Sequence, residues 1–179
     1  MAITRLGGAN AISGTIPQGN IANASLGAVT ALPAAIATGK VLQVVQASTA
    51  TQANSNSDTY ADTNLTASIT PSSSSNKVLV LVQQGGVAKS NADNHVQIRV
   101  YRDSTEVGGT IPGRSIAYTG NSDYNYVGTG FSASILDSPS STSALTYKTQ
   151  FARNGSGGGF ARVQTDSAIS FITLLEIEA

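Results

Sequence analysis

Apolar and polar residues alternate along much of the chain, with the period of two that a half-buried β-strand shows. In residues 65–69, Leu65 and Ile69 flank an alanine, and threonine and serine stand between them. Residues 78–82 are instead apolar at every position, which is typical of a strand covered on both faces. Pro71 and the small polar residues 72–76 separate the two segments and predict a turn. We therefore expect residues 65–82 to form a central pair of strands.

The same alternation predicts further strands, separated by residues typical of turns. These further segments are 41–47, 95–102, 114–118, 127–136, 145–153, 160–164 and 168–177. The terminal segment 168–177 is again apolar on both faces. Short strands at roughly even spacing, with no convincing helix in residues 40–179, predict an all-β fold, an antiparallel β-sandwich or jelly roll.

Residues 1–39 differ from the rest of the chain. No charged residue occurs between positions 6 and 39, and the apolar residues are mostly small and interrupted by glycine, asparagine and proline. Such a segment has too few large side chains for a core of its own, yet it is too apolar for a solvated linker. A floppy tail, or a short helix over residues 23–31, is compatible with this pattern. We favour an extended N-terminal arm (1–39) that lies on another subunit, ahead of a sandwich domain (40–179).

The large apolar residues of the arm are the ones we expect to make its assembly contacts. They are Ile3, Leu6, Ile12, Ile16, Ile21, Leu26, Leu32 and Ile36.

Two strands that are apolar on both faces present more apolar surface than one sandwich of about 140 residues can bury. We expect the first, residues 78–82, to lie centrally, so that Leu79→Asp or Leu81→Asp would prevent folding. We expect the terminal strand to line a subunit interface through Phe171, Ile172 and Leu174. Ile172→Asp would then mainly dissociate the oligomer.

Composition narrows the classes of partner. Charged residues make up 11% of the 179 residues, and ten basic residues balance ten acidic ones. No electrostatic footprint therefore points to nucleic acid or to an anionic membrane surface. No apolar run reaches about 18 residues, so we expect no membrane-spanning helix. Cysteine is absent, which excludes disulfides and thiolate metal sites.

No combination of residues indicates catalysis. The single histidine, His95, follows Asp93 at the start of a predicted strand, a pattern more typical of a surface residue than of a general base. Asp58 and Asp62 lack the spacing of a calcium loop, and the glycine-rich residues 154–159 lack the lysine of a phosphate loop. We predict no enzymatic activity, no metal site and no cofactor.

One loop carries residues of a kind that binds sugars. Tyr118, Tyr124 and Tyr126, together with Asp123, place aromatic rings beside amide and carboxylate groups. Tyrosines that pack at a loop or a subunit contact would show the same pattern, and we favour that interpretation over a glycan-binding patch.

Several blocks of the sequence resemble virion structural proteins of tailed phages. The opening MAITRLGGANAISGTIPQGNIANASLGAVTALPAAIATGKVLQVVQ resembles the start of such proteins. The blocks LTASITPSSSSNKVLVLV, IRVYRDST, ILDSPSSTSALTYKTQF and ITLLEI resemble a β-domain that recurs in their fibre-like and virion-surface proteins. The resemblance covers essentially the whole chain. It implies a non-enzymatic structural protein on the virion, in the form of a homotrimer.

The resemblance leaves two functions open. A jelly roll with an extended arm fits a capsid decoration (cement) protein, which would bind the major capsid protein or other virion subunits through the arm. The alternative is a short tail or head fibre whose loops bind host glycans. We favour the decoration protein.

Overall fold

A computed structural model describes residues 40–91, 94–108, 129–156 and 158–179 of the chain. The chain divides into two units, Met1–Thr38 and Gly39–Ala179, and every strand of the described residues belongs to the second. The predicted boundary between an arm and a sandwich domain stays a prediction, because residues 1–39 lie outside the described ranges. The helix considered for residues 23–31 and the strand predicted at 114–118 also lie outside them.

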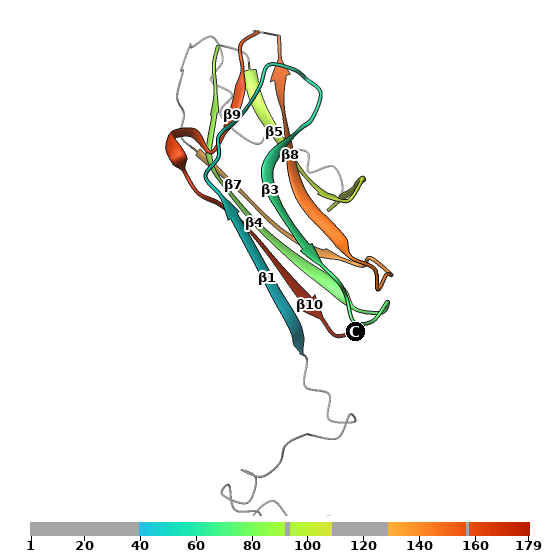
Figure 1. Cartoon of the computed structure of the whole chain (residues 1–179). Helices are drawn as coiled ribbons and strands as arrows, with labels where there is room; N and C mark the ends of the chain where they lie inside the picture. Colours follow the sequence, from blue (N-terminus) through green and yellow to red (C-terminus); the bar gives the residue numbers. More distant parts are fainter. Residues whose placement is uncertain (1–39, 92–93, 109–128, 157) are drawn as a thin grey trace, which may run out of the picture. The chain divides into compact units, whose positions relative to one another are not determined.

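Ten strands and one short 3-10 helix make up the described residues. They are β1 (Val41–Thr49), β2 (Ala53–Ser55), β3 (Ala61–Ile69), β4 (Lys77–Lys89), β5 (Asn94–Arg102), β6 (Thr105–Val107), β7 (Thr129–Asp137), β8 (Leu145–Gly155), β9 (Ala161–Val163), η3 (Thr165–Ser167) and β10 (Ser170–Ile177). β1, β10, β4 and β7 form one layer, and β3, β8, β5 and β6 form the other (Figure 1).

The strands pair in a nested order. β1 pairs with β10, β3 with β8, β4 with β7, and β5 with β6, all antiparallel. When the short strands β2 and β9 are set aside, the first strand pairs with the last and each inner strand with its counterpart. This is the two-sheet jelly-roll arrangement. The predicted all-β, antiparallel sandwich of the jelly-roll type is confirmed.

The two strands that are apolar on both faces lie in the interior of their sheet, as predicted. β10 runs between β1 and β4, and β4 runs between β10 and β7. An interior strand has all its backbone groups paired, so both of its faces can lose water without leaving a donor or acceptor unsatisfied.

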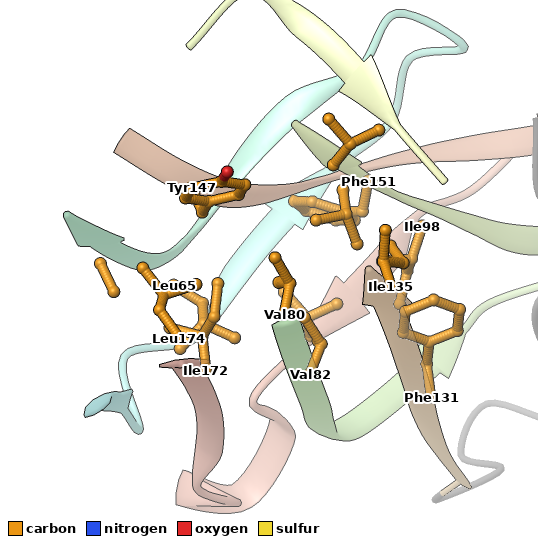
Figure 2. Close-up of a cluster of buried hydrophobic side chains, with 14 of the residues drawn as sticks. Leu65, Val80, Val82, Ile98, Phe131, Ile135, Tyr147, Phe151, Ile172 and Leu174 are labelled. Carbon is orange, nitrogen blue, oxygen red and sulfur yellow. The ribbon is translucent and has the colours of Figure 1, made fainter. Parts of the chain in front are cut away.

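The core lies between the two sheets and consists of one face of each (Figure 2). From the first sheet it takes Val80, Val82, Ile135, Ile172 and Leu174, and from the second Leu65, Ile98, Tyr147 and Phe151. Most of these side chains are at most a few per cent exposed. Each buried aliphatic or aromatic side chain contributes about 1.5–3 kcal/mol to folding.

The pair Gly85-Gly86 predicts a turn or a bulge, and the structure has a bulge, so β4 continues beyond these glycines. Its register against β7 shifts between Gln84 and Val87, and the strand then continues to Lys89. Gly86 has φ of 58°, and a Cβ there would lie 2.5 Å from the Thr165 nitrogen, so glycine is needed at this position. Residues 87–89, where the polar sequence of 87–93 predicts a connection, are therefore strand. This part of β4 pairs with β9, which in turn pairs with β2.

Polar side chains inside the sandwich satisfy one another. Thr149 donates to the Gln84 Oε1 at 2.9 Å, and the Gln84 amide donates to the Ser170 hydroxyl at 2.9 Å. Thr63 shares a hydrogen bond with Thr149 of the neighbouring strand in the same sheet. All four residues are fully buried. A core can hold such groups because each has a partner.

Candidate functional site

The outer face of the β1–β10–β4–β7 sheet carries large apolar side chains. Of the six exposed large hydrophobic residues in the described ranges, five belong to this sheet: Val41, Leu42, Val44, Leu81 and Leu136. Val44 is 59% exposed and Leu136 is 55% exposed. We call this surface the apolar face and define it by Val44, Leu79, Leu81, Leu136, Phe171 and Leu175.

The strand register aligns four of these residues across the sheet. Val44 of β1 pairs with Leu175 of β10, and Leu175 pairs with Leu79 of β4. Leu79 pairs with Leu136 of β7. Directly paired residues of neighbouring strands lie about 4.5–5.5 Å apart, so their side chains touch. A continuous apolar row therefore crosses all four strands.

The remainder of the same face is polar but nearly uncharged. Gln46, Thr173, Leu81 and Ser134 form the next row of paired positions, and Lys77 is the one charged residue on this face within the described strands. A shallow hollow of about 330 Å³ lies beside this second row, on the side away from the first row. Its lining is Gln46, Leu81, Val82, Gln83, Phe171 and Thr173.

The structure corrects which side of the terminal strand could meet another subunit. Ile172 and Leu174 are 0% exposed and point into the core of their own domain, so they cannot line a subunit interface. Phe171 alternates with them and lies on the outer face, half-buried. Its place in an interface stays a prediction.

The same alternation corrects the prediction for β4. Leu79 is half-buried and Leu81 is 38% exposed, whereas Val78, Val80 and Val82 fill the core. A charge at Leu79 or Leu81 therefore meets water in the single domain. The expectation that Leu79→Asp or Leu81→Asp prevents folding is wrong, because the apolar residues on this side of β4 are not part of the core.

The outer face of the second sheet is charged. Arg99 Nη1 lies 2.9 Å from a Glu106 carboxylate oxygen, and its guanidinium stacks 4.2 Å from the centre of the Tyr60 ring. Lys148 Nζ lies 2.9 Å from an Asp62 carboxylate oxygen. Burial raises the pKa of Asp62, but hydrogen bonds from Gln150 and Lys148 outweigh it and hold the pKa below its ordinary value.

A buried carboxylate closes one end of the sandwich. Glu176 of β10 is 1% exposed, and its Oε1 accepts hydrogen bonds from the Ser72 backbone N–H at 2.6 Å and the Asn76 amide at 2.6 Å. Its other oxygen accepts from the Gln43 amide at 2.7 Å. Burial raises the pKa of Glu176, but the hydrogen bonds from Asn76, Gln43 and Ser72 outweigh it and lower the pKa to about 2. The polar turn 71–76 is thereby fixed to β10.

A second polar cluster ties the two sheets together. The Asp137 carboxylate at the end of β7 accepts from Arg102 Nη1 at 2.5 Å and from the Tyr147 hydroxyl at 2.7 Å. Burial and the hydrogen bond to Asp137 both raise the pKa of Tyr147. Tyr147 therefore stays a neutral donor, and the three groups form a structural tie without a reactive member.

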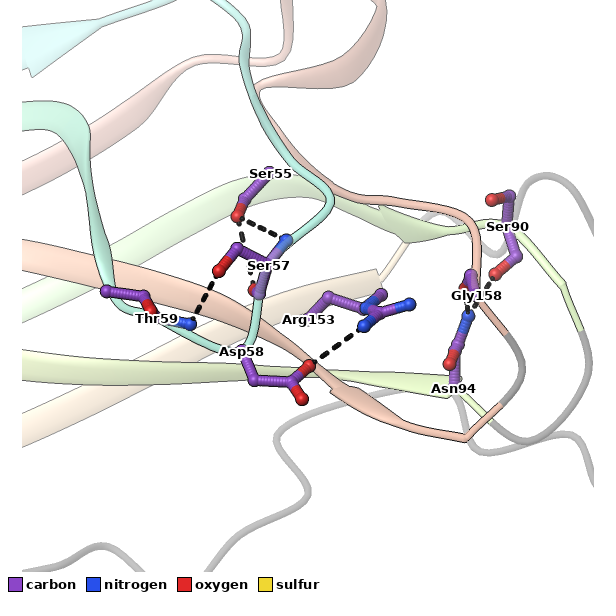
Figure 3. A network of polar contacts seen from close by, with 8 residues as sticks. All are labelled: Ser55, Ser57, Asp58, Thr59, Ser90, Asn94, Arg153 and Gly158. Carbon is purple, nitrogen blue, oxygen red and sulfur yellow. Dashed lines mark hydrogen bonds and ion pairs between the residues drawn. The ribbon is translucent and has the colours of Figure 1, made fainter.

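The loops at the other end of the sandwich form a polar network (Figure 3). Asp58 accepts from Arg153 at 3.1 Å, and Asn94 donates to the backbone oxygens of Ser90 and Gly158. An open groove of about 520 Å³ lies at this end. It is lined by Asn54, Ser55, Asn56, Gly159, Phe160 and Arg162, and the Arg162 guanidinium stacks 3.7 Å from the centre of the Phe160 ring.

The described residues contain no group of three or more histidine, cysteine, aspartate or glutamate side chains that could hold a metal ion. Asp58 and Asp62, on separate segments, are each paired with a cation. His95 is 6% exposed, so the surface position expected from its place at the start of a strand is wrong.

Two predicted sites fall outside the described residues. The eight apolar residues of the arm lie within 1–39, and Tyr118, Asp123, Tyr124 and Tyr126 lie within 109–128. Both stay predictions. Sequence reasoning missed the groove at Asn54 and Arg162 because its two sides are far apart in the chain.

Within the described part of the chain, no helix has the length and apolar character needed to cross a membrane.

Comparisons with known proteins identify no family. No family model matches the chain, and no curated protein matches it. Among solved structures, the chain is similar to one described as the structure of infectious bursal disease virus Gx strain, with 14% sequence identity and a TM-score of 0.34. The similarity covers 76% of this chain and 40% of that one, so this chain spans well under two thirds of its length. We draw neither family nor function from a likeness of this size.

Proposed function

We propose that this protein is a non-enzymatic structural protein of a virion, and that it serves as a capsid decoration (cement) protein. The observation that carries the proposal is the apolar face, a wide and nearly uncharged surface on the jelly roll. Surfaces of this kind mark sites of association more than sites of chemistry. The charged side chains of the described residues support the same view, because many of them pair with one another.

The proposal gives each part of the chain a role. The jelly roll forms a homo-oligomer on the particle surface. The arm, residues 1–39, extends from it and binds neighbouring subunits of the major capsid protein. The charge-free sequence of residues 6–39 supports this role, because it can be buried between subunits without removing a charge from water.

Deleting residues 2–38 tests the role of the arm. We expect the shortened chain to keep the far-UV circular dichroism of a β-protein and its oligomeric mass, but to lose binding to capsids that lack the protein, measured by co-sedimentation. A shortened chain that still decorates capsids would refute the proposed attachment.

A matched pair of full-length variants separates apolar contact from added charge. Ile16→Asp with Ile21→Asp places two carboxylates at apolar arm positions, and we expect it to abolish capsid binding. Ser13→Asp with Asn20→Asp adds the same charge at polar positions of the same arm and should bind within a few-fold of the unmodified protein. Equal loss in both variants would attribute the effect to charge alone.

The groove at Asn54 supports a second function, a short fibre that binds host glycans. Two amide side chains beside a guanidinium stacked on a phenyl ring can donate and accept the hydrogen bonds that sugar hydroxyls need. Glycan-array binding by the pure protein, lost in Asn54→Ala with Asn56→Ala, would support a fibre. Loss in Tyr124→Ala with Tyr126→Ala instead would place the site in the predicted tyrosine patch. Absence of glycan binding would count against this function.

A further inference from the structure

We propose that copies of this chain meet through the apolar face, with the row Val44–Leu175–Leu79–Leu136 at the centre of the contact. The proposal names the surface of the homo-oligomer in the proposed function and rests on that part of it. It replaces the inward-facing Ile172 and Leu174 with residues of the opposite face. The occupant of the face is the same sheet of a second copy. Such a two-fold contact closes a dimer, so the homotrimer that the sequence resemblance implies would need a different surface.

The size of the face is the first argument. Four strands spaced about 4.8 Å apart, each with about eight residues of about 3.4 Å, span roughly 500 Å². Two such faces in contact bury roughly 1,000 Å², the lower limit for a specific interface. The area is therefore sufficient for association between copies.

The make-up of the face is the second argument. Apolar residues form the row Val44–Leu175–Leu79–Leu136, and hydroxyl and amide groups form the neighbouring row of Gln46, Thr173 and Ser134. Interfaces have this mixture at their centre, with charges depleted. The outer face of the second sheet is charged instead. It carries Arg99, Glu106, Lys148 and Asp62.

Charge is the argument for a second copy in preference to a foreign protein. A surface that meets itself must not repel itself, and this one has a single charge, Lys77, at its end beside Ile177. The whole chain has a formal net charge of zero, so copies approach without long-range repulsion. A foreign partner would be selected by complementary charge, and this face offers almost none.

Shape agrees with this occupant. Outer sheet faces pack on one another about 10 Å apart with their side chains interdigitating, as the inner faces of a sandwich do. The hollow between Leu81 and Phe171 has room for a side chain of an opposing sheet. Val44 and Leu136, at the two ends of the row, are the most exposed residues of the apolar face. Their side chains are free to enter the hollow of the opposing copy.

Cysteine cross-linking gives a direct test, because the natural chain contains no cysteine. In the full chain, Val44→Cys with Leu136→Cys places thiols on β1 and β7, three strand spacings or about 14 Å apart. A disulfide needs Cα atoms less than about 7 Å apart, so these two cannot bond within one copy. We expect copies to be linked rapidly under mild oxidation, as seen by non-reducing electrophoresis.

The matched control is Ser68→Cys with Thr105→Cys. Both positions are exposed and lie on the first and last strands of the other sheet. We expect at least tenfold slower linkage than in the apolar-face variant at equal concentration. Equal rates for the two variants would overturn the proposal, because they would reflect random collision.

Charge substitution gives a second readout on the full chain. Val44→Asp with Leu136→Asp should weaken self-association roughly 100-fold in sedimentation velocity, because like charges would face each other across the contact. The melting temperature of the single domain should stay unchanged, since both residues are exposed. Mixing with Val44→Lys plus Leu136→Lys should restore association. Ser68→Asp is the control and should keep the oligomer.

Other occupants give distinct results. A natural chain that is monomeric at 100 µM, about the concentration at which weak homo-oligomers form, would overturn the proposal. If deletion of residues 2–38 then increased binding of an apolar dye, the chain's own arm would be the occupant. If the natural chain were monomeric without that increase, the occupant would be a foreign protein. These measurements use no capsid, so the proposed capsid binding can fail while self-association stands, and the reverse.

Discussion

The two sheets of the jelly roll have similar inner faces and different outer faces. Inside, both contribute valine, leucine, isoleucine and aromatic side chains to one core. Outside, the β3–β8–β5–β6 sheet carries ion pairs such as Arg99–Glu106, and the β1–β10–β4–β7 sheet carries the apolar row from Val44 to Leu136. The same strand architecture therefore carries two chemically different outer faces.

This difference separates what the fold needs from what the surface is used for. A sandwich is stabilised by the faces between its sheets, and the charged outer face shows that nothing in the fold requires leucine on the outside. Exposed Leu136 and Val44 add little to the stability of a single domain while lowering its solubility. The proposed association between copies would account for both.

The largest effect expected is a contrast between two adjacent leucines of β10. Leu174 is 0% exposed in the core, whereas Leu175 lies half-buried on the apolar face. Leu174→Ala should lower the free energy of unfolding by about 2–5 kcal/mol, because it leaves a cavity. Leu175→Ala should cost about 1 kcal/mol or less at concentrations where the chain is monomeric.

Urea denaturation of both variants measures this contrast. Self-association at high concentration should show the opposite order. Leu175→Ala should weaken it, whereas a Leu174→Ala protein that still folds should keep it. Equal loss of stability from the two substitutions would mean that the outer side of β10 is also part of the core.

Much of the fold follows from the sequence, but the sequence does not tell which face of a doubly apolar strand points into the core. The period of two in residues 65–69 and the doubly apolar segments were enough to predict a jelly roll with β4 and β10 in central positions. Where both phases of a strand are apolar, the period no longer says which phase faces inward. Glu176 adds to the ambiguity, because a glutamate is expected to face water. It nevertheless shares the inward phase of Ile172 and Leu174 and is buried.

The bulge and the groove depend on distant partners, which no local pattern records. Gly86 has a left-handed backbone at the bulge, and Thr165, which is distant in the sequence, leaves no room for a Cβ there. β2 sits in a segment of threonine, asparagine and serine that has no strand pattern, and forms because β9 is available to pair with it. Leu79 and Leu81 carry the sequence signal for the apolar face, but their pattern alone predicts a place in the core.

The next largest effect concerns the buried carboxylate. Glu176→Gln keeps the shape of the side chain but turns one acceptor into an NH₂ group that faces the donors of Ser72, Asn76 or Gln43. We expect a loss of about 1–3 kcal/mol, because buried donors are left without an acceptor. Glu178→Gln, on the exposed neighbour of Ile177, is the control and should change stability by less than about 0.5 kcal/mol.

The same residue predicts a pH dependence. The pKa of Glu176 in the folded chain is about 2, below its ordinary 4.5, so the carboxylate stabilises the fold above pH 4.5. That contribution should be lost as the pH falls from 4.5 towards 2, when the group becomes protonated in both states. Melting temperatures between pH 6 and pH 2 should therefore fall more steeply for the natural chain than for Glu176→Gln. Parallel curves would show that Glu176 does not cause the acid loss.

A smaller effect is expected for the tie between the sheets. Tyr147→Phe removes the hydroxyl that donates to Asp137 at 2.7 Å but keeps the buried ring. Because Arg102 still satisfies the carboxylate, the loss should be about 0.5–1.5 kcal/mol by urea denaturation. Arg102→Ala leaves Asp137 without its cation and should cost more. A larger loss for Tyr147→Phe than for Arg102→Ala would reverse this assignment.

The smallest effect is expected on the charged outer face of the β3–β8–β5–β6 sheet. Substitutions there test whether this face, too, takes part in self-association. Arg99 and Glu106 are an ion pair with side chains 31% and 23% exposed, and such pairs contribute about 0.2–1 kcal/mol. A double-mutant cycle of Arg99→Ala and Glu106→Ala should give a coupling in that range, decreasing with added salt. None of the three variants should change the mass of the oligomer in sedimentation velocity. Dissociation of the oligomer by Arg99→Ala would make the charged sheet the subunit interface, and the apolar face would then need a different explanation.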